Sequence, residues 1–258
     1  MNKEQYLKQK KQYKKQQNDP RTVCKKCLRP SPACFCAHLS PFKTETKFCF
    51  LMHPLEAKPS QIGTGRMSHI ALINSHLIID TDFDQNQEFL KLLKLQEYNP
   101  YLLYPGDKSL KIDDETSPAI PSNKKLLIFI LDGTWPCAKK MMKKTTKLHQ
   151  LPKISFSTQL ESQFSIKHQP AKYCLSTIES VHYLLGALEK HEIEKIAPKQ
   201  KASLLNALNE NVLFHQRCAA DPNNNSYARE TFPYKEKKQR VASKKWETRS
   251  ICYRDETS

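Results

Sequence analysis

Four cysteines near the start of the chain, Cys24, Cys27, Cys34 and Cys36, have the residue type and spacing of a metal site. They lie within thirteen residues in the pattern C-x2-C-x6-C-x-C, which favours convergence of all four thiolates on one tetrahedral ion. Zinc is the metal best suited to four thiolates in a site without redox chemistry. Because four sulfurs leave no position for a substrate, we expect a structural or RNA-positioning role.

A second group of reactive side chains directly follows an apolar run at 126–131 that is typical of a buried strand. The group consists of Asp132, Gly133, Thr134 and Trp135. In open α/β sheets, ligands bind beyond the carboxyl ends of strands, so these side chains are candidates for a binding or catalytic site. Two simpler interpretations remain open: Asp132 as a helix N-cap, and Trp135 as a core residue.

Pro136 suits the first turn of a helix that would begin just after this group. That helix would carry a basic face of Lys139, Lys140, Lys143, Lys144 and Lys147. Such a face suits phosphate groups, although a solvated helix surface would have the same composition.

Glycine is rare, with five in 258 residues, so each position is informative. Gly63, Gly65, Gly106 and Gly133 all fall beside predicted strands. Glycine is used where a backbone turns sharply or approaches a ligand closely. We expect the three loops that contain these residues to converge on one pocket, although each alone is also compatible with a simple turn.

Short apolar runs alternate with longer amphipathic ones, which predicts a layered α/β fold with a largely parallel sheet. The predicted strands are 48–52, 76–79, 101–104 and 126–131, and the predicted helices include 87–95, 177–190 and 203–218.

The net charge of +16 indicates a polyanionic partner, and half of it lies in the first thirty residues. We predict a basic arm at 1–20, a zinc-binding motif at 21–40, a catalytic domain at 41–220 and a basic tail at 221–258. No apolar run is long enough to span a bilayer, and the N-terminal stretch lacks the apolar core of a signal peptide. We therefore expect a cytoplasmic protein without a membrane partner, in which the cysteines are reduced.

The ordered set of short motifs resembles one known family, the DTW-domain proteins, which are tRNA-uridine aminocarboxypropyltransferases. The resemblance spans roughly residues 21–215 and includes the four-cysteine pattern with Arg29-Pro30. The other matching motifs are His53-Pro54-x-Glu56, Thr64-Gly65-Arg66, Tyr104-Pro105-Gly106, Asp132-Gly133-Thr134-Trp135 and Leu175-Ser176-Thr177-Ile178-Glu179. The chain departs from the family at Gly63, where asparagine is usual, and has less arginine at 165–168.

The resemblance implies a SPOUT-like α/β fold with helices on both faces of the sheet and a knotted crossing of the chain. It also implies transfer of the 3-amino-3-carboxypropyl group from S-adenosylmethionine to N3 of a uridine in tRNA, with release of 5′-methylthioadenosine. Zinc would be structural, tRNA would be the partner, and no stable protein partner is implied.

Asp132 is the candidate general base for the uridine. The candidate donor-binding residues are Pro105, Gly106, Asp132, Gly133, Thr134, Trp135, Leu175, Ser176, Thr177 and Glu179. Within this set, backbone N–H groups near Ser176 and Thr177 suit the donor carboxylate, and Glu179 suits its ammonium or ribose hydroxyls. The candidate RNA contacts are Arg29, Arg66, Lys139 and Lys140.

Two other functions fit parts of the same sequence. An RNA methyltransferase would use the same donor with its methyl group directed at the acceptor. A zinc-containing RNA-binding module without catalysis would account for the cysteines and the charge, but not for the group at 132–135. His53, after a predicted strand, suits a turn or the pocket, and we favour the turn.

Overall fold

The computed structural model of the chain describes residues 23–58, 63–106, 108–114, 120, 123–156, 162, 164 and 174–221. The predicted basic arm at 1–20 lies outside the described residues, as does the predicted basic tail apart from Asp221.

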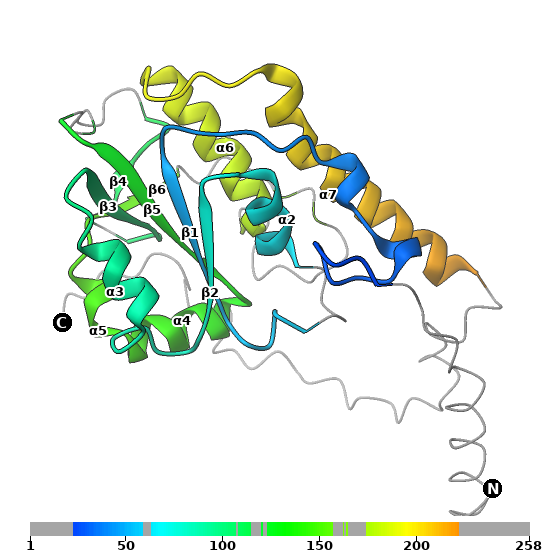
Figure 1. Cartoon of the computed structure of the whole chain (residues 1–258), viewed down its shortest axis with the longest axis horizontal. Helices are drawn as coiled ribbons and strands as arrows, with labels where there is room; N and C mark the ends of the chain where they lie inside the picture. The colour runs from blue at the N-terminus through cyan, green and yellow to red at the C-terminus, as the bar shows by residue number, and fades with distance from the viewer. Residues whose placement is uncertain are drawn as a thin grey trace, which may run out of the picture.

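Six strands form one sheet in the order β2-β1-β5-β3-β6-β4, and every neighbouring pair is parallel. The strands are β1 (Lys47–Met52), β2 (Ser75–Ile79), β3 (Tyr98–Leu103), β4 (Leu110–Lys111), β5 (Lys125–Asp132) and β6 (Lys153–Ser155). This sheet confirms the predicted parallel α/β architecture. Since the strands are parallel, their carboxyl ends lie at one edge, where the loops after β1, β3 and β5 also begin (Figure 1).

Helices cover both faces of the sheet, as predicted (Figure 1). The helices α2 (Thr64–Ala71), α6 (Thr177–Lys190) and α7 (Pro198–Ala220) lie on one face. The helices α3 (Gln87–Leu93), α4 (Trp135–Lys144) and α5 (Thr146–His149) lie on the other.

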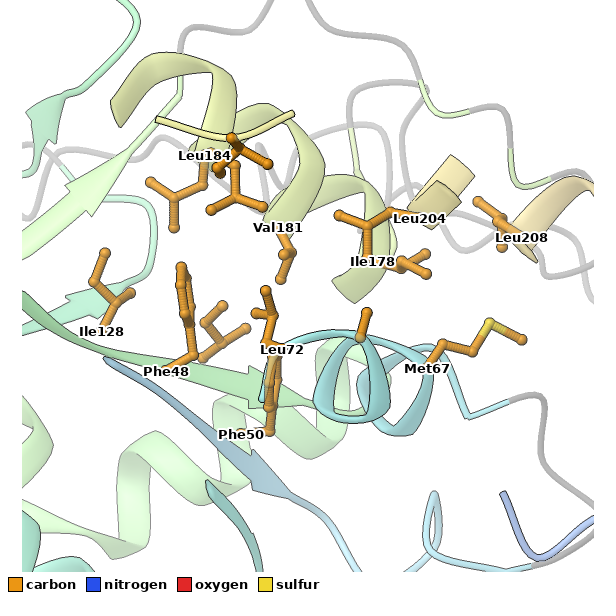
Figure 2. Packing of buried hydrophobic residues seen from close by; sticks show 14 of the residues in the cluster. Phe48, Phe50, Met67, Leu72, Ile128, Ile178, Val181, Leu184, Leu204 and Leu208 are labelled. Atoms are coloured by element: carbon orange, nitrogen blue, oxygen red, sulfur yellow. The ribbon is translucent and has the colours of Figure 1, made fainter. Parts of the chain in front are cut away.

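Alternation along the central strands explains the two layers, because successive side chains of a strand point to opposite faces. Phe48 and Phe50 of β1 pack in one buried cluster, whereas Cys49 and Leu51 belong to the other. Figure 2 shows the first cluster, in which Phe48, Phe50 and Ile128 of the sheet face apolar side chains of α2, α6 and α7.

The long apolar elements agree with the sequence-based prediction. The four predicted strands are present with bounds shifted by at most three residues, and α6 has the predicted bounds. The unpredicted elements are short ones and α2: the strands β4 and β6, the two 3-10 turns at 31–33 and 36–38, and α2, which begins at Thr64 inside a segment expected to be a loop. The helix predicted to carry the lysines up to Lys147 ends at Lys144, and Lys147 lies on the separate helix α5. The knotted crossing stays a prediction, because most of the segment between β6 and α6 lies outside the described residues.

The N-terminal cysteine motif packs against the end of the chain. It contains two 3-10 turns, η1 (Ser31–Ala33) and η2 (Cys36–His38), and its buried Phe35 joins the cluster under α6 and α7. The guanidinium of Arg29 lies 3.2 Å from His215 Nε2 on α7. The amide of Ser40 donates to Ser203 Oγ, also on α7, at 3.2 Å. The motif is therefore docked on α7, within the main fold.

Among the described helices, none combines the length and apolar character needed to cross a lipid bilayer.

Candidate functional site

Asp132 lies at the meeting point of several predicted site segments. It is the last residue of β5, pairs in register with Met52 of β1, and is only 4% exposed. Its Oδ1 accepts a hydrogen bond from Thr177 Oγ1 at 2.6 Å. Thr177 is the first residue of α6, so this bond joins two predicted site segments that are 45 residues apart in the sequence. Because β5 ends at Asp132 and the N-cap of α4 is Thr134, the alternative of Asp132 as that N-cap does not hold.

Gly65 brings a third predicted segment to the same carboxylate. A Cβ atom added at Gly65 would lie 2.3 Å from Asp132 Cγ, a separation that no side chain can adopt. The preceding Gly63 caps α2 with a φ of 70°, a left-handed conformation that favours glycine. The two glycines therefore allow the first turn of α2 to lie directly against Asp132. The sequence predicted that a glycine here would approach a ligand, whereas in the structure Gly65 approaches a protein carboxylate.

The first turn of α6 is held by a capping box between Ser176 and Glu179. Glu179 is 1% exposed, and its Oε2 accepts hydrogen bonds from the amide of Ser176 at 2.7 Å and from Ser176 Oγ at 2.6 Å. Ser162 Oγ donates to the same oxygen at 2.9 Å. Glu179 thus has a structural role that the sequence interpretation did not include, and it holds Thr177 in place beside Asp132. The predicted contact of Glu179 with the donor stays a prediction.

Two aromatic rings meet beside this centre. The ring centroids of Tyr104, which follows β3, and Trp135, at the start of α4, are 6.4 Å apart. Both side chains are partly exposed, and Trp135 belongs to neither buried cluster, so the interpretation of Trp135 as a core residue does not hold. The contact brings the loop at 104–106 to the residues after β5. Within that loop, the Gly106 carbonyl accepts from the amide and the hydroxyl of Ser109, at 3.0 and 2.5 Å.

The remaining predicted donor-binding residues lie in these same loops. Pro105 and Leu175 are partly exposed, next to Gly106 and Ser176 respectively, and Thr134 is an exposed N-cap that makes no side-chain capping bond. A Cβ added at Gly106 would meet open space, and one added at Gly133 would lie 3.1 Å from Cys137 Cβ.

The predicted RNA contacts differ in exposure. Lys139 and Lys140 are exposed on α4, and Arg66 is partly exposed in the first turn of α2. Arg29 is only 6% exposed and contacts His215, which gives it a place in the packing of the cysteine motif on α7. The two lysines therefore present the most accessible charge of this set.

His53 was not among the predicted site residues. It follows β1, its amide donates to the Asp132 carbonyl at 2.9 Å, and it is 6% exposed. Its Nδ1 accepts from the Leu55 amide at 3.2 Å, which confirms the predicted role in the turn. Burial and the charge of Lys140 lower the pKa of His53, while Glu56 acts in the opposite direction. The signal available in the sequence was a histidine directly after a predicted strand. Only the order of the strands in the structure shows that this strand, β1, lies beside β5.

The four cysteine sulfurs gather in one place, as the spacing predicted. All four lie within 4.8 Å of one another, with separations of 3.8 Å for Cys24–Cys36 and 3.6 Å for Cys27–Cys34. A tetrahedral ion with bonds to sulfur of about 2.3 Å requires separations of about 3.8 Å, so the arrangement fits such an ion. Hydrogen bonds from the amides of Cys27 and Lys26 lower the pKa of the Cys24 thiol to about 6, whereas burial raises the pKa of the Cys27 and Cys36 thiols.

Comparison with known proteins identifies the family. A family model described as the DTW domain matches residues 21–216, which include the cysteine motif and the residues around Asp132. The chain belongs to the DTW-domain family. The family model treats the cysteine motif and the α/β region as one unit, in agreement with the docking of the motif on α7.

Several curated proteins resemble this DTW-domain chain. A protein of Drosophila melanogaster named tRNA-uridine aminocarboxypropyltransferase 2 is 29% identical over 174 residues, which cover 66% of this chain and 67% of the relative. The protein of the same name from Mus musculus is 29% identical over 178 residues and is covered over 58% of its length. tRNA-uridine aminocarboxypropyltransferase A of Arabidopsis thaliana is 24% identical over 226 residues, covering 76% of this chain and 82% of the relative. No solved structure matches the chain significantly.

Proposed function

We propose that this DTW-domain protein transfers the 3-amino-3-carboxypropyl group of S-adenosylmethionine to N3 of a uridine in tRNA. The observation that carries the proposal is the convergence of α2, β5 and α6 on the Asp132 carboxylate. The names of the relatives supply the reaction and the tRNA substrate. The net charge of +16 suits a polyanionic acceptor, and we expect the reaction to take place in the cytoplasm.

The reaction requires the donor to be held in a bent conformation. Its sulfonium activates three carbons, and placement alone selects the γ-methylene of the methionine moiety. A bond forms between uridine N3 and this carbon while the bond from the carbon to sulfur breaks. The electron pair of that bond stays on sulfur, so neutral 5′-methylthioadenosine leaves.

Asp132 is the proposed acceptor of the N3 proton. The hydrogen bond from Thr177 Oγ1 to Oδ1 fixes the orientation of its carboxylate, and the capping box fixes the start of α6. An aspartate with an ordinary pKa of about 3.9 is a weak base, so we place proton transfer late, as the bond to N3 forms. The acceptor base must also leave its stack to reach a carboxylate that is 4% exposed.

The loops around Asp132 would hold the donor. The partly exposed rings of Tyr104 and Trp135 offer a surface on which a purine or a pyrimidine can stack. The start of α6 favours an anion such as the donor carboxylate, and with the Ser176 amide bonded to Glu179, the amides of Thr177 and Ile178 are best suited to it. Pro105, Gly106, Gly133, Thr134 and Leu175 complete the proposed donor site.

Lys139, Lys140 and Arg66 would bind phosphates of the acceptor, with the two lysines on the exposed face of α4. Arg29, buried against His215, would act on RNA mainly by holding the cysteine motif on α7.

Zinc is the proposed occupant of the four-cysteine cluster, because four converging thiols suit a redox-inert tetrahedral ion. Cys24, Cys27, Cys34 and Cys36 would hold it, and the ion would supply structural stability. The chemical step relies on the residues around Asp132 instead.

Product analysis with two labelled donors tests the proposed function. The protein is incubated with unmodified tRNA and S-adenosylmethionine labelled either in the carboxyl carbon or in the methyl group. We expect carboxyl label in the RNA and 5′-methylthioadenosine as the by-product. Methyl label in the RNA with S-adenosylhomocysteine would identify a methyltransferase. No label in the RNA with folded, zinc-loaded protein would favour a non-catalytic RNA-binding module.

A further inference from the structure

The cysteine motif carries an exposed leucine in a backbone conformation that leucine disfavours. Leu28 has a φ of 60°, in the left-handed region. Its amide donates to the Cys24 carbonyl at 2.8 Å, and the Cys24 amide donates to the Arg29 carbonyl at the same distance. Leu28 therefore closes a tight hairpin around the first two cysteines. Glycine or asparagine adopts the left-handed conformation more readily than leucine, so the hairpin explains the backbone of Leu28 but not its side chain.

Packing does not explain this side chain either. Leu28 is 40% exposed, although the adjacent Cys27 and Arg29 are only 2% and 6% exposed. It belongs to neither of the buried apolar clusters of the described chain. A single exposed apolar side chain is common on protein surfaces. One that is also held in an unfavourable backbone conformation calls for a functional explanation.

The surface beside Leu28 is apolar and basic. Val23 pairs with Pro30 across the same hairpin and is 51% exposed. Lys25 and Lys26, in the turn of the hairpin, are exposed as well. We call Val23, Lys25, Lys26 and Leu28 the knuckle tip.

The charge of the motif is positive even with its metal in place. Residues 23–41 contain Lys25, Lys26 and Arg29 and no acidic side chain. A zinc ion held by four thiolates would carry a formal charge of about −2, which these three cations outweigh. The knuckle tip therefore offers apolar area together with a net attraction for anions.

This combination fits a nucleotide whose base is unpaired. In an RNA duplex the bases are stacked and paired, so the duplex offers phosphates to the lysines but little apolar surface to a leucine. An unpaired base exposes its faces to an apolar side chain, while its phosphates stay within reach of neighbouring lysines. A protein partner would account for the two apolar side chains, but the two lysines and the net charge of +16 favour RNA.

We propose that the knuckle tip holds an unpaired nucleotide of the acceptor tRNA, with Leu28 and Val23 against its base and Lys25 and Lys26 at its phosphates. The inference rests on the proposed function for the identity of the RNA. It adds a contact made by an element other than those that meet at Asp132. No bond is made or broken at the knuckle tip, which contributes to the affinity for tRNA and to its placement.

Substitutions at Leu28 separate this contact from the stability of the motif. Leu28→Asn suits the left-handed conformation better and removes the apolar side chain, whereas Leu28→Met keeps an apolar side chain. At about 0.15 M salt, we expect Leu28→Asn to weaken binding of unmodified tRNA at least about 5-fold and Leu28→Met to stay within about 2-fold of the wild type. The unfolding midpoint and the bound zinc should not fall in Leu28→Asn.

Ile73 provides the matched control, because it is 65% exposed in the segment before β2, outside the knuckle tip. Ile73→Asn also replaces an exposed apolar side chain by an amide. It should bind tRNA with the wild-type affinity.

The salt dependence of binding separates the base contact from the phosphate contacts. Loss of an apolar contact lowers the affinity alike at every salt concentration, so Leu28→Asn should keep the wild-type slope of log Kd against log salt. The double variant Lys25→Ala/Lys26→Ala should reduce that slope by about 1.4, since each phosphate contact of a single strand contributes about 0.7.

The outcomes distinguish this inference from the proposed function. A wild type that binds tRNA but transfers no carboxyl label overturns the proposed function alone. With a wild type that binds and transfers, wild-type affinity in Leu28→Asn overturns the inference about the knuckle tip alone. A loss of affinity that Leu28→Met shares equally, or that accompanies loss of zinc, also overturns it. Unchanged tRNA affinity with a changed oligomeric state in Leu28→Asn would place Leu28 at a protein interface instead.

Discussion

Gly65 packs directly against the Asp132 carboxylate, so we expect a single methyl group added at position 65 to disrupt the proposed site. A Cβ at position 65 would lie 2.3 Å from Asp132 Cγ, so Gly65→Ala must displace either the carboxylate or the start of α2. We expect the transfer rate to fall about 100-fold, the size of effect that a displacement of about 1 Å produces at a reacting group. Single-turnover transfer of carboxyl label to tRNA measures it.

Gly186 provides the matched control for that substitution. It lies within α6, and an added Cβ would be 3.8 Å from its nearest neighbour, Lys201 Nζ. Gly186→Ala should keep the wild-type rate and raise stability by up to about 1 kcal/mol, since alanine favours a helix. Equal rates for Gly65→Ala and the wild type would contradict the arrangement around Asp132.

Thr177 is the second residue that fixes the Asp132 carboxylate. Thr177→Val keeps the shape of the side chain and removes the hydroxyl that donates to Oδ1. The loss of one such bond, about 1.4 kcal/mol in the transition state, corresponds to a 10-fold lower transfer rate. Thr177→Ser retains the hydroxyl and should stay close to the wild type, and equal rates for the serine and valine variants would remove Thr177 from this role.

At the scale of single residues, the sequence predicted the positions of the reactive groups better than their partners. Asp132 was predicted because a carboxylate follows a fully apolar strand. The partners Thr177, Gly65 and His53 depend on which helices and strands are neighbours in space, and one sequence does not determine that order. For this reason Gly65 was expected to approach a ligand and instead approaches Asp132.

At the scale of elements, the capping box of α6 connects stability to the site. Glu179→Ala removes a buried carboxylate that accepts three hydrogen bonds, and we expect it to lower the free energy of unfolding by about 2 kcal/mol. Glu179→Gln should cost less, because glutamine also serves in a capping box. Urea denaturation measures both. A donor affinity that falls in Glu179→Gln with stability unchanged would instead place Glu179 on the donor.

The predictable elements were those with long and uniform patterns. β1 and β5 are apolar along most of their length because both faces are covered, and α6 combines a regular apolar stripe with a capping motif. β4 and β6 have two and three residues, too few to establish a period. α2 was not predicted because Gly63 and Gly65 lie at its start. Glycine disfavours a helix except where close packing requires it.

At the scale of the whole molecule, the cysteine motif is docked on α7, and we expect its metal to stabilise the fold. We expect one zinc ion per chain, and a metal at 100 times its dissociation constant would stabilise the fold by about 2.7 kcal/mol. Chelation should therefore lower the unfolding midpoint by roughly 5–10 °C. Donor binding should persist, because the motif bonds to His215 and Ser203 of α7, which is not one of the elements that meet at the Asp132 carboxylate. Metal analysis and calorimetry test this, and an unchanged midpoint after verified metal removal would contradict it.

Stability should also fall on acidification, because half-buried histidines favour the neutral form. Burial lowers the pKa of His69 and His182 in the folded chain. The unfolded chain, with a histidine pKa of about 6.5, then binds more protons, so their contribution is present above that pH and is lost as pH falls through the folded values. The double variant His69→Gln/His182→Gln should lose less stability than the wild type between pH 7 and pH 5. Parallel curves of stability against pH for the two proteins would contradict the assignment of this loss to His69 and His182. Release of metal at low pH affects both proteins alike, so it does not disturb the comparison.

The most direct test of the whole account compares Asp132→Asn with the wild type. Asparagine retains the size of the side chain and an oxygen that accepts from Thr177, but it is no longer a base. Transfer of carboxyl label from S-adenosylmethionine to tRNA is measured under single-turnover conditions, alongside the dissociation constant of the donor. We predict an unchanged dissociation constant and a transfer rate at least about 100-fold lower. Near-normal transfer by Asp132→Asn would contradict the central role given to this carboxylate.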